Sequence, residues 1–207
     1  VEAVVAKGEP VYGLNTGFGK LKHVAIAAED LEELQENLIL SHCCGVGDPM
    51  PEDEVRVAQV LRLNGLVRGH SGLSMELVDA LVAFFEKGFV PVVPKKGSVG
   101  ASGDLAPLAH MAAAYMGHGE AFVGGKRMRA SAALKKLGLA PVRLKAREGL
   151  ALINGTEIIK AVGVTALARA ENLSKAADAL AALTIEALLG SLKPFDDRFA
   201  ELKGLPA

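Results

Sequence analysis

The stretch of this 207-residue sequence best suited to chemistry is residues 97–107, which read Gly-Ser-Val-Gly-Ala-Ser-Gly-Asp-Leu-Ala-Pro. Glycines on both sides of Ser102 let the backbone reach conformations that other residues enter only at a cost, so the loop can bend back on itself. Two ordinary interpretations fit this composition. The loop can cap the helix that follows, with Ser102 or Asp104 as the N-cap residue, or it can bind an anion at that helix terminus.

The tripeptide Ala101-Ser102-Gly103, followed by Asp-Leu-Ala-Pro-Leu-Ala, closely resembles the signature of the aromatic amino acid ammonia-lyases. The resemblance implies that the amide nitrogen of Gly103 attacks the carbonyl of Ala101 and that two waters leave, one of them from Ser102. The product is 4-methylidene-imidazol-5-one (MIO), an electrophilic alkene that forms autocatalytically and needs no external cofactor. The residue types suit this, because Gly103 offers an unhindered nitrogen and Ser102 a hydroxyl to eliminate. Asp104 is expected to help position the loop for cyclisation.

A second glycine-rich loop, residues 11–20, carries Tyr12 in the sequence Tyr-Gly-Leu-Asn-Thr-Gly-Phe-Gly. A tyrosine in such a loop can serve only as a packing anchor. The block also resembles the ammonia-lyases, and the resemblance implies that Tyr12 lies on a mobile inner loop and acts as the general base. A phenol with an ordinary pKa of about 10 is a weak base at neutral pH, so this role requires a site that stabilises the phenolate.

His42 lies near the end of a helix that the apolar spacing predicts over residues 28–44. A histidine there can interact with the negative end of the helix dipole. The block Leu-Ser-His-Cys-Cys-Gly-Val-Gly also resembles the part of the ammonia-lyase sequence where members that act on histidine place a substrate-selecting His. Members that act on tyrosine use His there too, so His42 leaves both substrates open.

A further resembling block is Leu-Ile-Asn-Gly-Thr-Glu, which contains Asn154. By itself, an Asn before Gly is typical of a turn or an N-cap. The resemblance implies that the side-chain amide of Asn154 donates a hydrogen bond to the carbonyl oxygen of the MIO, which would increase its electrophilicity as an oxyanion-hole donor does.

Aromatic residues make up only 4% of the chain, a composition that favours packed helices over sheets. Apolar periodicity and cap signals predict helices over residues 28–44, 52–70, 74–87, 105–116, 131–137 and 154–189, an extended segment at 89–94, and a hairpin over 120–128. With the resemblance, the expected fold is mainly α: a helical bundle of the aromatic amino acid lyase type with glycine-rich active-site loops and a small β-hairpin. The long last helix is expected to form a bundle or subunit interface.

The formal net charge of −1 offers no basic surface for nucleic acid. No apolar run approaches the roughly 20 residues of a membrane span, and no signal peptide is evident, so we expect a cytoplasmic protein without membrane contacts. The only two cysteines, Cys43 and Cys44, are adjacent, which suits neither a structural disulfide nor a metal site. No metal is expected.

The chain begins inside what reads as the end of a helix, residues 1–8, with no capping residue before it. The family that it resembles continues for several hundred residues. We therefore expect an N-terminal fragment of less than half a lyase subunit, inactive by itself. Gly and Pro signals at residues 47–51 suggest a boundary between an N-terminal piece, 1–50, with the Tyr-bearing loop and first helix, and the start of the helical body, 51–207.

Three functions follow for consideration. The first, implied by the resemblance, is a homotetrameric ammonia-lyase that converts L-histidine to trans-urocanate and ammonia: the substrate amine adds to the methylidene carbon derived from Ser102, and Tyr12 removes a β-proton. The second keeps the MIO but takes tyrosine as substrate or yields a β-amino acid as a 2,3-aminomutase does. The third is a non-catalytic helical assembly module.

Overall fold

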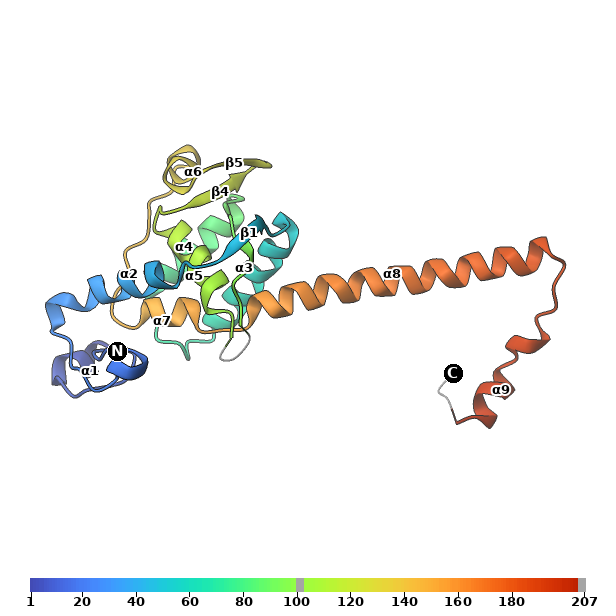
Figure 1. Ribbon diagram of the computed structural model, residues 1–207, viewed down its shortest axis with the longest axis horizontal. Helices are drawn as coiled ribbons and strands as arrows, with labels where there is room; N and C mark the ends of the chain where they lie inside the picture. The colour runs from blue at the N-terminus through green and yellow to red at the C-terminus, as the bar shows by residue number, and fades with distance from the viewer. Residues whose placement is uncertain (100–102, 205–207) are drawn as a thin grey trace. The chain divides into compact units, whose positions relative to one another are not determined.

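The computed structural model describes residues 1–99 and 103–204. The chain divides into two compact units, residues 1–162 and 163–207. Helices dominate both units, and the predicted mainly helical class is confirmed (Figure 1). The boundary expected at residues 47–51 lies inside the first unit, and the division into 1–50 and 51–207 stays a prediction.

Most of the α-helices described lie close to the expected ranges, but those at Glu148–Ile153 and Asp197–Leu202 were not predicted. They are α1 (Glu2–Lys7), α2 (Leu31–His42), α3 (Glu52–Leu66), α4 (Met75–Glu86), α5 (Leu105–Tyr115), α6 (Ala130–Leu137), α7 (Glu148–Ile153), α8 (Glu157–Ala187) and α9 (Asp197–Leu202). Short 3-10 turns lie at Gly19–Leu21, Ala28–Asp30 and Lys193–Phe195. The main difference concerns the long helix predicted from Asn154, which begins at Glu157 because a separate short helix, α7, ends just before it.

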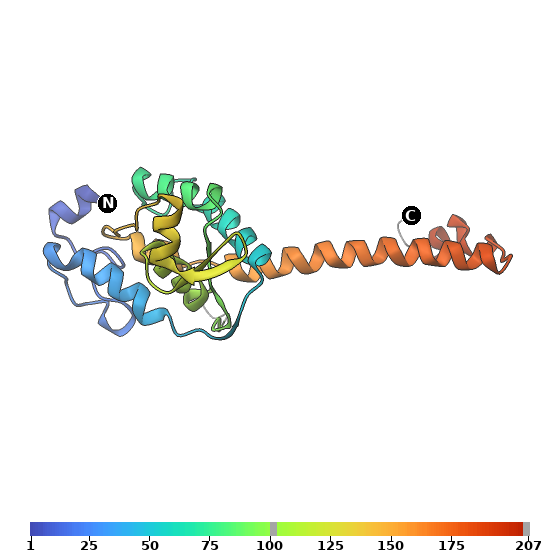
Figure 2. The ribbon, with the colours of Figure 1, turned by 90° about the horizontal axis from the view of Figure 1, so that it is seen from above.

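Two small sheets accompany the helices of the first unit. In one, β1 (Val46–Pro49) pairs antiparallel with β3 (Pro94–Lys96). In the other, the strand order is β2 (Val90–Pro91), β4 (Glu120–Val123) and β5 (Lys126–Arg129), all antiparallel. The predicted hairpin is confirmed, since Gly124 and Gly125 both have positive φ between β4 and β5. Helix α6 packs on this hairpin, as both views of the ribbon show (Figure 2).

Helix α5 forms the centre of the first unit and is buried along most of its length. Its many alanines let α2 and α7 pack closely against it. At its C-terminal end the Tyr115 ring stacks on Phe84, with ring centroids 5.0 Å apart. The Tyr115 hydroxyl accepts a hydrogen bond from Gln59 Nε2 at 3.1 Å. Burial raises the pKa of Tyr115, so this phenol stays protonated.

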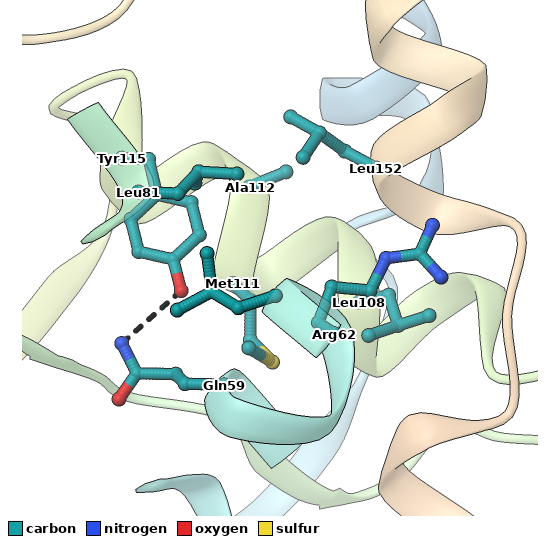
Figure 3. A pocket seen from close by; sticks show the side chains of 9 residues that line it. Gln59, Arg62, Leu81, Leu108, Met111, Ala112, Tyr115 and Leu152 are labelled. Carbon is teal, nitrogen blue, oxygen red and sulfur yellow. Dashed lines mark hydrogen bonds between the residues drawn. The ribbon is translucent and has the colours of Figure 1, made fainter. Parts of the chain in front are cut away.

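A cavity of about 20 Å³ lies beside Tyr115 (Figure 3). It has room for about one water molecule. Binding sites for small molecules measure several hundred Å³. The core beside Tyr115 is therefore a packing region and no substrate site.

In the second unit, α8 exposes much of the apolar stripe that the sequence predicts. Leu167, Leu173, Leu180 and Leu183 are each more than 60% exposed. Contrary to the expectation from the sequence, an 18-residue window within residues 148–187 meets the length and composition of a membrane span. One such helix is weak evidence for a membrane, because the core helices of soluble bundles meet the same test.

Candidate active site

The backbone at Gly103 lies in close contact with the backbone at Gly155. The amide of Asp104 donates a hydrogen bond to the carbonyl oxygen of Gly155 at 2.7 Å. Gly103 has a φ of +117°, and a Cβ built there would overlap this same oxygen. Both facts require glycine at position 103. Ala101 and Ser102, the other two members of the expected tripeptide, lie outside the described residues.

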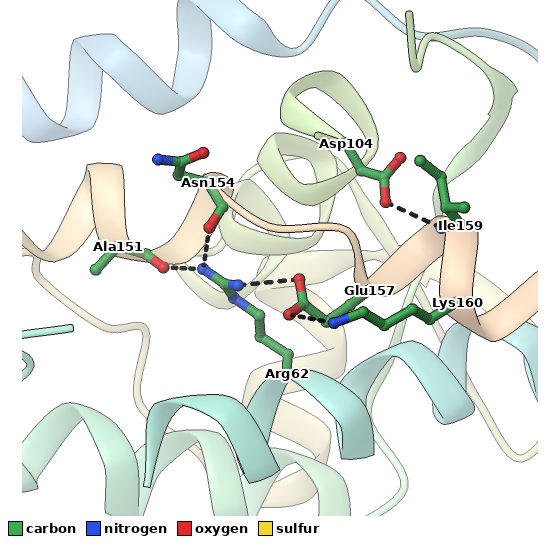
Figure 4. Close-up of polar contacts among 7 residues, drawn as sticks. All are labelled: Arg62, Asp104, Ala151, Asn154, Glu157, Ile159 and Lys160. Carbon is green, nitrogen blue, oxygen red and sulfur yellow. Dashed lines mark hydrogen bonds and ion pairs between the residues drawn. The ribbon is translucent and has the colours of Figure 1, made fainter. Parts of the chain in front are cut away.

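The buried Asp104 carboxylate joins Ser98 to the first turn of α8 through two hydrogen bonds. The residue is fully buried, Oδ1 accepts from Ser98 Oγ at 2.8 Å, and Oδ2 accepts from the amide of Ile159 at 2.9 Å (Figure 4). Asp104 occupies the N-cap position of α5, yet its side chain makes no cap hydrogen bond to that helix. It caps the first turn of α8 instead, where the helix dipole favours a negative charge. The predicted N-cap position of Asp104 is therefore confirmed, but its side chain does not cap α5.

Asn154 lies in the turn between α7 and α8. Its amide donates to Leu150 O at 3.0 Å as the C-cap of α7, which agrees with the turn interpretation. Its carbonyl oxygen faces the Arg62 guanidinium, while its side-chain amide points away from that group (Figure 4). Through Gly155, the fold brings Asn154 next to Gly103 and Asp104. These three predicted residues therefore form one cluster.

The loop with Tyr12 is held mainly by local contacts. Asn15 Oδ1 accepts from the amide of Val11 at 2.8 Å, and the Tyr12 and Phe18 rings pack edge to face with centroids 6.2 Å apart. Gly13 joins the loop to α7, since a Cβ there would overlap Leu150. The Tyr12 side chain is 54% exposed. In the part of the chain that the structure describes, no hydrogen bond holds its hydroxyl.

His42 is the last residue of α2 and is half-buried. Its Nδ1 lies 2.8 Å from the carbonyl oxygen of Leu38, so the tautomer with a proton on Nδ1 donates to the helix end. This is the helix-terminal contact that the sequence allows. Across residues 1–99 and 103–204, no hydrogen bond or ion pair links His42 or Tyr12 to Asn154 or Asp104. A common site for all these residues stays a prediction.

The sequence model of the aromatic amino acid lyase family matches residues 1–207. The chain belongs to this family. A histidine ammonia-lyase of Myxococcus xanthus is 52% identical over 206 residues, which are 100% of this chain and 41% of that relative. The chain thus spans about two fifths of the length of the curated relatives it matches.

Solved structures agree with the family. The crystal structure of histidine ammonia-lyase from Trypanosoma cruzi matches with a TM-score of 0.90 at 38% identity, covering 98% of this chain and 39% of that one. Phenylalanine aminomutase of Pantoea agglomerans matches with a TM-score of 0.90 at 34% identity, covering 97% and 39%. The expected aromatic amino acid lyase fold is confirmed for this chain.

Sequence reasoning missed one polar group in this lyase chain, the buried ion pair of Arg62 and Glu157 (Figure 4). Arg62 lies on α3 and Glu157 on α8, and their side chains are only 11% and 8% exposed. The partners lie 95 positions apart in sequence, so no local spacing could reveal them. The only local signal was the run Asn-Gly-Thr-Glu, which ends at Glu157.

His110 on α5 is another polar residue close to the site. Its Nε2 accepts a hydrogen bond from the amide of Gly45 at 3.0 Å, and burial lowers its pKa. Both effects favour the neutral ring. Over the described residues, no group of three or more His, Cys, Asp or Glu is arranged to hold a metal ion.

Proposed function

We propose that the complete protein is a histidine ammonia-lyase, which converts L-histidine to trans-urocanate and ammonia. The observation that carries this proposal is the 52% identity, over the whole chain, to the Myxococcus xanthus relative of that name. The activity is proposed for the complete protein, because the chain spans 41% of that relative. The 207 residues alone are expected to be inactive.

We also propose that residues 101–103 form the MIO. The described residues fit this group, because Gly103 has the positive φ and the close backbone contact that only glycine tolerates. Once formed, the group supplies an electrophilic carbon to which the substrate amine can add, which makes the amine a better leaving group. Asn154, beside Gly103 in the fold, supplies a side-chain amide that can donate to the ring carbonyl.

Tyr12 is proposed to accept the β-proton of the substrate. Its exposure and its position on a loop beside α7 leave the phenol accessible to a substrate. His42 is proposed to contact the imidazole of the substrate. With Nδ1 donating to Leu38 O, its Nε2 carries a lone pair that can accept a hydrogen bond from a substrate ring N–H.

The second candidate is an MIO-dependent aminomutase or a lyase that acts on tyrosine. The likeness to the Pantoea agglomerans phenylalanine aminomutase, with a TM-score of 0.90, favours keeping it. The third candidate is a helical assembly module, which the exposed apolar leucines of α8 support. Because the two MIO functions differ in substrate or product and the module has none, one assay separates all three.

The test uses the complete protein with L-histidine, L-tyrosine and L-phenylalanine supplied separately. Ultraviolet absorbance would detect the unsaturated acid, and chromatography would detect a β-amino acid. Urocanate from histidine supports the first proposal, an unsaturated acid from tyrosine supports the tyrosine lyase, and a β-amino acid from any of the three substrates supports the aminomutase. An intact mass lower by two waters shows that the ring formed. An unmodified mass without any product favours the assembly module.

The partners and location are proposals as well. We propose a small amino acid substrate, a homotetramer in the cytoplasm, and no nucleic-acid or membrane partner. The exposed leucines of α8 support assembly, because large apolar patches mark interfaces. Light scattering of the 207-residue chain should show a dimer or larger species that Leu173→Gln with Leu180→Gln weakens. Arg169→Gln on the same helix is the control, and a monodisperse monomer at high concentration would contradict this account.

A further inference from the structure

The Arg62 guanidinium links three elements that meet beside the candidate site. From α3, Nη2 donates to the carbonyl oxygens of Ala151 and Asn154, the latter at 3.3 Å, and Nη1 donates to Glu157 Oε2 at 2.9 Å. Figure 4 shows the guanidinium between the end of α7 and the start of α8. Arg62 lies outside the motif blocks and Glu157 is only the last residue of the block that contains Asn154, and the proposed chemistry uses neither side chain.

The charges of this pair match the helix ends that they face. Arg62 binds carbonyl groups at the C-terminal end of α7, where the dipole is negative, and Glu157 lies in the first turn of α8, where it is positive. Ala151 O and Asn154 O lie where a helix end leaves carbonyls without intrahelical partners. Burial lowers the pKa of Arg62 and the Glu157 carboxylate opposes that shift, so the guanidinium remains charged.

Gly155 passes directly against this ion pair. A Cβ at position 155 would overlap both Glu157 Oε2 and Arg62 Nη1, so the backbone lies in van der Waals contact with the charged groups. On its other side, the Gly155 carbonyl accepts from the amide of Asp104 and contacts Gly103. The ion pair and Gly103 therefore both contact the peptide segment at Gly155.

We propose that Arg62, paired with Glu157, is a positioning residue for ring closure at residues 101–103, an inference that rests on the proposed function. By fixing the backbone of Asn154 and Gly155, the ion pair holds the Gly155 carbonyl in position against Gly103. Ring closure joins the nitrogen of Gly103 to the carbonyl carbon of Ala101. One water leaves with that carbonyl oxygen and two amide hydrogens, and a second with the Ser102 hydroxyl and α-hydrogen, so no oxidant is needed.

A purely structural ion pair predicts a different outcome from a positioning residue. Removing one partner from a buried pair destabilises a protein, whereas replacing both with apolar residues is often neutral. The decisive variant is therefore the double exchange Arg62→Met with Glu157→Met, which can preserve stability but cannot bind Ala151 O or Asn154 O. Arg62→Lys keeps the charge but loses the planar fork. Arg127→Met, in the exposed pair with Glu120, is the matched control.

The experiment follows the intact mass of the complete protein after cell-free synthesis, together with its melting temperature. We expect the double variant to melt near the wild type yet to lose its two waters at least about tenfold more slowly. Arg62→Lys should fall between them, and Arg127→Met should match the wild type. Water loss at the wild-type rate in the double variant would overturn the proposal, and so would slow loss that only tracks the melting temperature across the variants.

Hydrogen exchange of the Asp104 amide separates this proposal from the proposed function. If the wild-type mass never falls, MIO formation fails, but the positioning of Gly155 by the ion pair is still tested by this amide, which donates to Gly155 O. We expect exchange at Asp104 at least about tenfold faster in the double variant, with unchanged exchange in the core of α5. Equal protection of the Asp104 amide in both proteins would show that Arg62 does not position this segment.

Discussion

Asp104 and Tyr12 are held in opposite ways. The Asp104 carboxylate is fully buried and accepts hydrogen bonds from Ser98 and Ile159, whereas the Tyr12 ring is 54% exposed and packs on the nearby Phe18. The difference matches the two tasks proposed for them. Closing a ring in the backbone requires that the surrounding backbone is held in place. A general base, in contrast, must lie where a substrate can reach it. An exposed side chain such as that of Tyr12 can change its position at a low free-energy cost.

The largest effect should come from Ser102→Ala in the complete protein, which tests the ring closure beside the buried Asp104. Only a hydroxyl is lost, so we expect an unchanged fold, but without that leaving group no alkene can form. Turnover of histidine should fall nearly to background, and the intact mass should lack the loss of two waters. Near-normal turnover in this variant would remove the MIO from the account.

On the exposed side, Tyr12→Phe should lower kcat by about 10²–10⁴, the usual contribution of a general base. KM should change little, because the phenol acts on a proton in the transition state. Steady-state kinetics of the complete protein would measure both constants. Phe18→Leu, which changes the neighbouring ring but no proton acceptor, is the control. A change confined to KM would make Tyr12 a substrate contact.

Two glycine exchanges compare the crowded backbone beside the ion pair with the exposed helix α8. Gly155→Ala should lower the free energy of unfolding by about 3 kcal/mol, because the new Cβ must displace the buried ion pair. Gly163→Ala on α8 meets no atom within 4 Å and should stabilise by about 0.5–1 kcal/mol. Urea unfolding measures both. Equal effects of the two exchanges would contradict the crowding at Gly155.

His42→Leu should weaken histidine binding and shift preference toward apolar rings by about 1–3 kcal/mol. The physical reason is the loss of a polar partner for the imidazole. The ratio of kcat/KM for histidine and phenylalanine measures the shift. His23→Leu, outside the predicted site, serves as the control. An unchanged ratio would place His42 outside the pocket.

The smallest effect concerns pH and His110. Burial lowers its pKa in the folded state, while the unfolded chain takes up the proton near pH 6.5. The effect of His110 on the free energy of unfolding is therefore absent above pH 6.5. Below that pH His110 lowers the free energy of unfolding, down to the pKa of the folded state, because the unfolded state binds more protons. His110→Gln should lose less stability than the wild type between pH 7.5 and pH 5. The same loss of stability in both proteins would exclude His110 as a source of the pH dependence.

Sequence reasoning placed most helices within a few residues, because their signals are local. Ser74, the first residue of the predicted range 74–87, is the N-cap of α4, and its hydroxyl accepts from the amide of Leu77 at 3.3 Å. The same reasoning predicted no helix at Glu148–Ile153 and began the next one at Asn154, whereas that turn is held by the contact of Arg62 with Asn154 O and by the hydrogen bond from Asp104 to Gly155 O. It placed Asp104 at the N-cap of α5 but could not find the partner of its side chain, because Ile159 lies 55 positions away.

The sequence by itself determined the glycine-rich loops, the four motif blocks and the family, because these depend on residue type and on neighbours in the chain. Tertiary structure alone decided that Gly103 meets Gly155, that Asp104 caps α8, and that Arg62 reaches Glu157. These contacts join residues 52, 55 and 95 positions apart. Their partners are chosen by how α3, α5, α7 and α8 pack, and that packing depends on the buried surface of the whole first unit.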